Sequence, residues 1–401
     1  MTQPKRVVLL YSGGLDTSCM LKWIPQNYEG CEMVTLTVDM GQGEDLEFAK
    51  QKALDLGAIE AHVIDVREQF ANRFLIPAVQ ANALYQQQYP LATALARYLI
   101  AEIAVDLAHQ TNSDTIAHGC TGKGNDQVRF EVGIRSLDPN MNIIAPIREW
   151  DMMRDTALAY AKENNIPLPD ELNKEYSVDA NLWGRSIESG VLEDPNHEPP
   201  ADIFTMAQPP EQAPDEADYV TITFDKGVPT ALDDQTMDMV QIVDTLNERA
   251  GRAGVGIIDM VEDRVVGLKS REIYEAPAAV TLITAHHDLE RFTGTVHQNE
   301  FKPLVDQRWS ELIYKGLWFD PLRSSLQAFI ETANERVTGN VKVKLYKGRA
   351  QVVGRESEFG IYDEDLITYQ SGHTFNQNDA VGFIQLWGLP TVASQKRKEK
   401  V

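Results

Sequence analysis

Features that mark several protein classes are scarce in this chain of 401 residues. It has only three cysteines, Cys19, Cys31 and Cys120, which are widely spaced and form no CxxC pair. This spacing argues against a disulfide framework or a structural zinc site and favours a reducing cytoplasm as the compartment. The sequence contains no stretch of about 18 consecutive apolar residues, so we expect no membrane span. The first residues lead into a strand-like run without a small-residue cleavage site, so we expect no signal peptide.

Positive charge is scarce as well. Lys and Arg total 37 against 60 Asp and Glu, which gives a formal charge of −23. Such a chain repels polyphosphate backbones, and it has no basic stripe, so we predict no nucleic-acid partner. A local basic pocket can still bind a small anion. His286 and His287 are adjacent positions of a predicted helix and point in different directions, so we predict no metal site formed by these side chains.

Strand and helix signals alternate through the first 165 residues. Continuous apolar runs predict strands at 7–11, 33–38, 61–66, 114–118 and 142–146. Helical patterns lie at 17–26, 45–56 and 91–109. This alternation predicts an α/β fold with a parallel sheet covered by helices on both faces.

The pattern changes after a proline-rich, acidic connector at 166–218. Strand-like alternation at 219–224, 341–345 and 351–353 is mixed with helical runs at 237–250, 277–293, 300–316 and 321–337. Hairpins mixed with helices predict a second domain of the α+β type. We therefore predict domains at 1–165 and 166–379, followed by a C-terminal segment at 380–401. Its charged end is typical of a solvated tail, although docking on a neighbouring subunit is the alternative.

The glycine loop after the first predicted strand is the most informative local sequence. It reads Tyr-Ser-Gly-Gly-Leu-Asp-Thr-Ser over residues 11–18 and opens a helix. Two glycines let the backbone approach an anion closely, and the first-turn N–H groups of the helix point at that anion. The loop is neither a Walker loop nor GxGxxG. The alternative is a tight turn in which Asp16, Thr17 and Ser18 merely cap the helix.

A second glycine-rich segment, residues 117–130, follows another predicted strand. Both loops should therefore emerge at the carboxyl edge of the sheet, where open α/β sheets bind ligands. Lys123 and Arg129 supply positive charge in a very acidic protein, and an arginine can form paired hydrogen bonds to a carboxylate. Thr121, Asn125 and Asp126 could bind the head group of an amino acid. His118 could move a proton at this edge, but a structural histidine is the favoured interpretation.

The first loop resembles SGGxDS/T, the pyrophosphate loop of enzymes that split ATP into AMP and pyrophosphate. Together, residues 11–19 and 118–131 resemble the argininosuccinate synthetase family of citrulline–aspartate ligases. Further matches are YPLATALAR (89–97), YSVDANLWGRS (176–186) and EDRVVGLKSREIYE (262–275). The chain departs from the family pattern at Ala94, where many members have serine, and at Glu272, where glycine is usual. The resemblance covers nearly the whole chain.

The resemblance implies a role for each matching position. The nucleotide would contact Leu10, Tyr11, Ser12, Gly13, Gly14, Leu15, Asp16, Thr17, Ser18, Val38 and Gly119. Aspartate would contact Thr121, Asn125 and Asp126. Citrulline would contact Tyr89, Asn125, Arg129, Ser177, Ser186, Glu262 and Tyr274. At Ala94 one hydrogen bond would either be missing or come from Thr93. Ser12, Thr17, Ser18 and Lys123, with Asp16 near the magnesium ion, are the candidates for stabilising charge in the reaction.

The resemblance also implies the activity, the cofactors and the assembly. The fold would be of the adenine nucleotide α-hydrolase type, and the enzyme would join citrulline to aspartate through citrullyl-AMP in arginine biosynthesis. It would use ATP with Mg²⁺ carried on the phosphates, and it would be a cytoplasmic homotetramer joined by its C-terminal segments. Two alternatives remain: a pyrophosphate-loop enzyme that adenylates a tRNA base or a purine, and a nucleotide sensor without activity.

Overall fold

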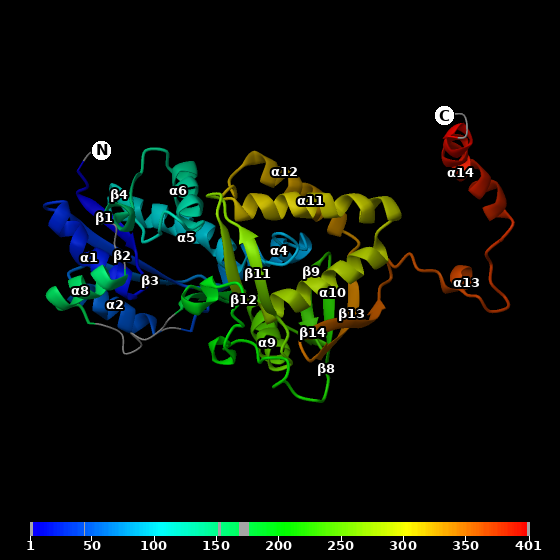
Figure 1. The fold of residues 1–401 in the computed structure, drawn as a ribbon, viewed down its shortest axis with the longest axis horizontal. Coiled ribbons are helices and arrows are strands. Elements are labelled where there is room, and N and C mark those ends of the chain that lie inside the picture. The colour runs from blue at the N-terminus through cyan, green and yellow to red at the C-terminus, as the bar shows by residue number, and fades with distance from the viewer. Residues whose placement is uncertain (1–2, 44, 151–153, 168–175, 399–401) are drawn as a thin grey trace. The chain divides into compact units, whose positions relative to one another are not determined.

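The computed structural model describes residues 3–43, 45–150, 154–167 and 176–398 (Figure 1). The chain divides into two compact units, Met1–Phe359 and Gly360–Val401. We describe each unit by itself.

The first sheet of the larger unit is parallel and five-stranded, with the order β3-β2-β1-β4-β5. Its strands are β1 (Arg6–Leu10), β2 (Glu32–Asp39), β3 (Glu60–Asp65), β4 (Thr115–Ala117) and β5 (Asn142–Ile144). The helices between and after them are α1 (Leu15–Asn27), α2 (Leu46–Asp55), α5 (Ala92–Gln110), α6 (Asp126–Leu137), α7 (Pro146–Trp150) and α8 (Arg154–Glu163). The predicted α/β class is confirmed.

Helices cover both faces of this sheet, which explains why β1 is apolar throughout. Val7 and Leu9 belong to a core cluster that includes residues of α1, α2 and α8. Val8, which points to the opposite face, belongs to a cluster built with α5 and α6. All three side chains are fully buried. A strand buried on both faces needs apolar residues at consecutive positions rather than at alternate ones.

Two antiparallel sheets follow in the same unit. One has the order β10-β9-β8-β13-β14 and the other β11-β12-β7-β6. The strands are β6 (Ser177–Asn181), β7 (Gly184–Glu188), β8 (Asp218–Asp225), β9 (Val228–Leu232), β10 (Gln235–Thr236), β11 (Ile257–Asp263), β12 (Lys269–Glu275), β13 (Gly339–Tyr346) and β14 (Arg349–Glu356). The helices are α9 (Met239–Arg252), α10 (Pro277–Thr293), α11 (Val296–Tyr314) and α12 (Pro321–Asn334). The mixed α and antiparallel β character of this region is confirmed.

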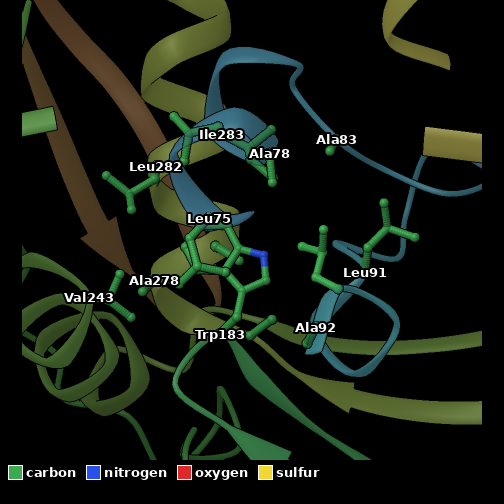
Figure 2. Close-up of a cluster of buried hydrophobic side chains, with 14 of the residues drawn as sticks. Leu75, Ala78, Ala83, Leu91, Ala92, Trp183, Val243, Ala278, Leu282 and Ile283 are labelled. Carbon is green, nitrogen blue, oxygen red and sulfur yellow. The ribbon is translucent and has the colours of Figure 1, made fainter. Parts of the chain in front are cut away.

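The hairpin β6–β7 is anchored in the largest core cluster by Trp183, which lies in its turn. The indole ring is fully buried among Leu75, Leu91, Ala278 and other side chains of that cluster (Figure 2). Its N–H donates to the carbonyl of Pro90 at 2.9 Å, which satisfies the only polar atom of the side chain. The hairpin therefore has a fixed position next to the start of α5.

Several elements differ from the sequence-based expectations. Residues 67–80 form a continuous helical segment, α3 (Arg67–Phe70), a π turn at Ala71–Leu75 and α4 (Ile76–Gln80), which we did not predict. The connector expected at 166–218 contains the hairpin β6–β7 and short 3₁₀ turns at Gly190–Glu193 and Ala201–Ile203. Part of that connector, 168–175, lies outside the described residues. Strands β11 and β12 were also not predicted, although the second of them ends a quoted motif.

The smaller unit contains α13 (Glu364–Ile367) and α14 (Asp379–Lys398). Residues 379–398 form one helix, which we did not predict, and none of its side chains is buried. Phe383, Ile384 and Trp387 on α14 are exposed to 60%, 64% and 76%. Among the described residues, none of the helices combines the length and apolar character needed to cross a membrane.

Candidate active site

The glycine loop leads from β1 into α1, as the sequence predicts. Gly14 occupies the N-cap position of α1 and has no side chain that could accept from the first-turn N–H groups. The hydroxyls of Ser12 and Thr17 lie 3.2 Å apart across the loop, and Ser18 shares a 3.1 Å hydrogen bond with Tyr11. Thr17 and Ser18 thus use their hydroxyls on Ser12 and Tyr11 within the loop. N–H groups and hydroxyls at a helix N-terminus suit a phosphate group.

Helix α2 packs directly against this loop. Gly13 has φ +77, and a Cβ at this position would lie 3.1 Å from the Cβ of Ala49. Both the backbone conformation and the close approach therefore require glycine. Lys52, one turn further along α2, is only 6% exposed, and its ammonium donates to the carbonyl of Gly13 at 2.8 Å. Sequence reasoning did not identify Lys52.

The second glycine-rich segment lies beside the first at the carboxyl edge of the sheet, because β4 pairs with β1. A Cβ on Gly119 would lie 3.4 Å from the side chain of Met20 in α1. Thr121 and Lys123 are exposed on this segment. His118 is buried, with Nε2 3.4 Å from Glu131, which agrees with a structural role for this histidine.

A buried network of polar side chains begins where this segment enters α6. Glu262 of β11 is 2% exposed and accepts hydrogen bonds from the hydroxyls of Tyr274, at 2.7 Å, and Tyr314. The amide of Asn125 donates to Tyr314 at 2.8 Å and lies 3.4 Å from Glu262. Three residues from three other parts of the chain thus converge on the carboxylate of Glu262. Burial and the neighbouring charge of Glu262 raise the pKa of Tyr274 well above its usual value, so this hydroxyl stays protonated and donates.

Stacked aromatic rings form the walls of this network. The rings of Tyr89 and Tyr274 lie 4.1 Å apart and nearly parallel, and those of Tyr85 and Tyr314 lie 3.5 Å apart. The hydroxyl of Tyr89 shares a 2.8 Å hydrogen bond with Thr93. Rings that stack on one another fix the direction of their hydroxyl groups, so the polar atoms of the network are preorganised.

Arg129 carries an unused donor into this region. Its Nε donates to the carbonyl of Tyr314 at 3.0 Å, and its NH1 donates to Asp126 at 2.7 Å. Its NH2 is buried and, among the described residues, has no hydrogen-bond partner. Leaving a buried charged donor unsatisfied is costly, so such an atom marks a place where a ligand can bind.

Asp126 is held between two guanidinium groups. Arg97 donates to it from Nε at 2.9 Å and from NH2 at 2.8 Å, and Arg129 donates from the other side. Burial alone would raise the pKa of Asp126, but the two arginines outweigh it and lower the pKa to about 2. Arg97 also pairs with Asp179 of β6. Both Arg97 and Asp179 lie within motifs quoted from the sequence, but sequence reasoning assigned them no role.

The remaining predicted residues lie at different distances from this network. Ser186 pairs in register with Tyr274, and its hydroxyl approaches the carbonyl of Asp179 at 3.5 Å. Ser177 is exposed at the far end of β6, opposite Glu188. Val38 lies in β2, paired with Ile64, and its carbonyl accepts from the amide of Gln42 at 2.8 Å. Ser177 and Thr121 are therefore the predicted substrate residues that the fold leaves exposed to solvent.

Glu272, which departs from the family pattern, has a partner in the structure. Arg264 donates from NH2 to Glu272 at 2.6 Å and to Glu188 at 2.5 Å. Burial and the proximity of Glu272 raise the pKa of Glu188 to about 7. The Nη1 of Arg264 donates to the carbonyl of Lys123 at 3.2 Å. Arg264, held by Glu188 and Glu272, therefore helps to fix the position of the second glycine-rich segment.

Side chains beside the glycine loop offer oxygen ligands for magnesium, but the described residues do not surround an ion with protein ligands. Within the part of the chain that the structure describes, no group of three or more His, Cys, Asp and Glu side chains is placed to hold a metal ion. Asp16 and the hydroxyl of Thr17 lie in the first turn of α1, beside the loop. Mg²⁺ keeps most of its waters and commonly takes one or two protein oxygens, which fits an ion that arrives on nucleotide phosphates.

Two family models together match most of the chain. The model described as the arginosuccinate synthase N-terminal HUP domain matches residues 6–167. The model described as the arginosuccinate synthase C-terminal domain matches residues 176–394.

Curated relatives match along the full length. A protein of Bacillus cytotoxicus named argininosuccinate synthase is 51% identical over 401 residues, covering 100% of this chain and 99% of the relative. Proteins of the same name from Streptococcus mutans and Halalkalibacterium halodurans are 50% and 51% identical, covering 99% of this chain in both cases and 99% and 97% of the relatives. The chain therefore belongs to the argininosuccinate synthase family and is an enzyme of the ligase class.

Proposed function

We propose that this enzyme joins citrulline to aspartate at the expense of ATP, forming argininosuccinate, AMP and pyrophosphate. The observation that carries the proposal is the buried network around Glu262, next to which Arg129 holds a buried Nη2 group that has no hydrogen-bond partner among the described residues. The carboxylate of an amino-acid ligand would accept from Arg129, and a neutral polar group at the other end of the ligand would bind to the network around Glu262. Such a ligand would bind at the segment that follows β4, and β4 pairs with the strand that precedes the phosphate loop, so the two sites would form the pairing that adenylation of citrulline requires.

The glycine loop supports the nucleotide part of the proposal. Its N–H groups and the hydroxyls of Ser12, Thr17 and Ser18 would hold the β- and γ-phosphates that leave as pyrophosphate. Val38 and Gly119 lie at the same edge of the sheet and would contact the nucleoside. The side chain of Lys123 is exposed on the second segment and would approach the phosphates from the solvent.

The buried network supports the citrulline part. The NH2 of Arg129 would donate to the carboxylate of citrulline, and Glu262 with Tyr274 and Tyr89 would orient the rest of the molecule. Ser186 lies across from Tyr274 and would add a hydroxyl, as would Thr93 and Ser177. Asn125, Thr121 and Asp126, at the start of α6, would bind aspartate.

The chemistry then follows in two steps. The ureido oxygen of citrulline attacks the α-phosphate of ATP, pyrophosphate leaves, and citrullyl-AMP forms. The neutral amine of aspartate next attacks the ureido carbon and expels AMP. Adenylation is needed because the ureido oxygen is otherwise a poor leaving group. The protein contributes orientation of two reactants, a term of about 7–11 kcal/mol, and fixed donors at the phosphates.

Magnesium would supply charge neutralisation on the phosphates. Asp16 and Thr17 are the protein groups that could contact it or its waters. The residues of the loop itself bind and orient the phosphate oxygens whether or not they touch the ion.

Omission of single substrates tests the proposal. The full-length enzyme is incubated with Mg-ATP, citrulline and aspartate, and pyrophosphate release is measured with each substrate left out. We expect release to require citrulline, and we expect exchange of labelled pyrophosphate into ATP with citrulline present and aspartate absent. Release that ignores citrulline would contradict the ligase proposal and favour another pyrophosphate-loop reaction.

The homotetramer implied by the family resemblance stays a prediction. The exposed apolar residues of α14, among them Leu386 and Trp387, are consistent with a helix that binds another chain.

A further inference from the structure

A buried lysine lies behind the glycine loop and takes no part in the reaction proposed above. Lys52 is on α2, which faces the loop with Ala49 and Lys52, two residues spaced by three. Ala49 sets the close approach of the helix to Gly13. Lys52 makes the polar contact at the same place, a 2.8 Å hydrogen bond from its ammonium to the Gly13 carbonyl.

Burying the ammonium group of Lys52 costs free energy, which a role in packing alone does not offset. Lys52 is 6% exposed, whereas lysines are almost never buried unless they are paired. Desolvation by burial lowers the pKa of Lys52, and the nearby thiol of Cys19 opposes this effect only in part. A group of this kind is stabilised when an anion binds close to it.

The hydrogen bond also fixes the orientation of a peptide plane. In a trans peptide the carbonyl oxygen and the following N–H point in opposite directions. The Gly13 carbonyl points back toward Lys52 and also accepts from Ser18, at 3.4 Å. The N–H of Gly14 then points away from α2 and donates to the hydroxyl of Ser12 at 3.4 Å. A phosphate would lie on the side of the loop away from α2.

We propose that Lys52 is a positioning residue of the phosphate loop, which orients the Gly14 N–H toward the leaving pyrophosphate and places a positive charge behind it. The inference rests on the proposed use of this loop for pyrophosphate. Lys52 needs no contact with the phosphates for this role. It acts through the Gly13 carbonyl and through its charge, which bound phosphate oxygens would neutralise.

Three variants separate the two contributions. Lys52→Met removes the hydrogen bond and the charge but keeps an unbranched apolar stem, while Lys52→Gln can keep a donor and loses only the charge. Lys50→Met, on the same helix and partly exposed, is the matched control. Binding of inorganic pyrophosphate to the full-length enzyme is measured by calorimetry at two salt concentrations, together with KM for each substrate.

We expect Lys52→Met to weaken pyrophosphate binding and raise KM for ATP on the order of 10–100-fold, the range for a hydrogen bond to a charged group. KM for citrulline and aspartate should stay within about twofold. Lys52→Gln should lie between Lys52→Met and the wild type, with a weaker salt dependence than the wild type. Lys50→Met should bind pyrophosphate like the wild type.

A purely structural lysine would give a different result. Lys52→Met would then change the thermal midpoint while pyrophosphate affinity of the folded enzyme stayed at the wild-type value, which would overturn the inference. If Lys52→Met does not fold, Lys52→Gln with an unchanged midpoint decides the question by the same measurement. Binding of pyrophosphate is measured without turnover, so this test is independent of the reaction. If the wild type binds pyrophosphate through Lys52 but releases pyrophosphate from ATP without needing citrulline, the proposed function is refuted and the inference about Lys52 stands.

Discussion

Arg97 and Asp126 are joined by two hydrogen bonds, from Nε at 2.9 Å and NH2 at 2.8 Å, both to the Oδ2 atom of the carboxylate. Arg129 donates to Oδ1 of the same carboxylate at 2.7 Å. One carboxylate thus contacts two guanidinium groups at the start of α6, and Asp179 supplies a second carboxylate to Arg97. This arrangement links the proposed aspartate site to the proposed citrulline site.

Removing that carboxylate should affect both binding and stability. We expect Asp126→Ala to raise KM for aspartate far more than KM for ATP, and to lower the free energy of unfolding by about 3–5 kcal/mol, the usual cost of breaking a buried ion pair. Steady-state kinetics and urea unfolding measure the two effects. Asp106→Ala, exposed on α5, is the control. Equal losses for aspartate and ATP would remove Asp126 from the aspartate site.

The same carboxylate predicts a loss of stability in acid. Its pKa is lowered from the model-peptide value of 3.8 to about 2, so its contribution to folding is complete above pH of about 4. As the pH falls from about 4 to about 2, the unfolded chain takes up this proton while the folded carboxylate stays ionised, so roughly 2 kcal/mol of stability is lost. Urea unfolding between pH 2 and pH 5 should show this slope. Asp126→Asn, which cannot titrate, should show a smaller slope, and an identical slope would contradict the assignment.

Arginine at position 129 should not be replaceable by lysine. Arg129 uses Nε on Tyr314 and NH1 on Asp126, and its NH2 remains for a ligand. A lysine ammonium cannot reach three partners in these directions. We expect Arg129→Lys to raise KM for citrulline on the order of 10–100-fold, since one charged hydrogen bond is lost. Arg135→Lys, exposed on the same helix, should behave like the wild type. Normal citrulline kinetics in Arg129→Lys would exclude this arginine from the site.

Tyr314 should be needed although no motif includes it. Its hydroxyl donates to Glu262 and accepts from Asn125 at 2.8 Å, so Tyr314→Phe removes one hydrogen bond from each of these two buried groups. Glu262 keeps Tyr274, and among the described residues the side-chain nitrogen of Asn125 keeps only the 3.4 Å contact with Glu262. We expect the free energy of unfolding to fall by about 1–3 kcal/mol. We also expect KM for citrulline to rise more, relative to the wild type, than KM for ATP. Tyr346→Phe, at an exposed position, serves as the control. If Tyr314→Phe keeps the wild-type KM for citrulline, the Tyr314 hydroxyl has no role in citrulline binding.

The parallel sheet could be predicted from the sequence because burial on both faces leaves an unmistakable local pattern. Val7, Val8 and Leu9 are all fully buried, so the strand is apolar at every position. Strand β12 lacks such a pattern, because Arg271 pairs with Asp259 at the surface while the next four residues are buried. Its pairing with β7 depends on contacts with residues about 90 positions earlier, which no local pattern records.

The candidate site divides in the same way. Residues 11–18 are contiguous, so the loop could be recognised directly. Tyr314 lies in a helix that was predicted correctly, yet its contact with Glu262 spans 52 residues. Lys52 lies 39 residues from the carbonyl that it contacts and resembles any other lysine of an amphipathic helix. Arg97 and Asp179 were inside quoted motifs, so a search for charge partners of Asp126 could have found them.

The polar network around Glu262 draws on both halves of the chain, with Asn125 contributed 137 residues before Glu262. A protease that cut the chain near residue 200 would leave Asn125, Arg129 and Ser186 on one fragment and Glu262, Tyr274 and Tyr314 on the other. Neither fragment alone would hold a complete set of contacts for the second substrate. Under the proposed function, the enzyme would therefore bind citrulline only after its two sequence halves have folded onto each other, so substrate recognition would require completed synthesis of the larger unit.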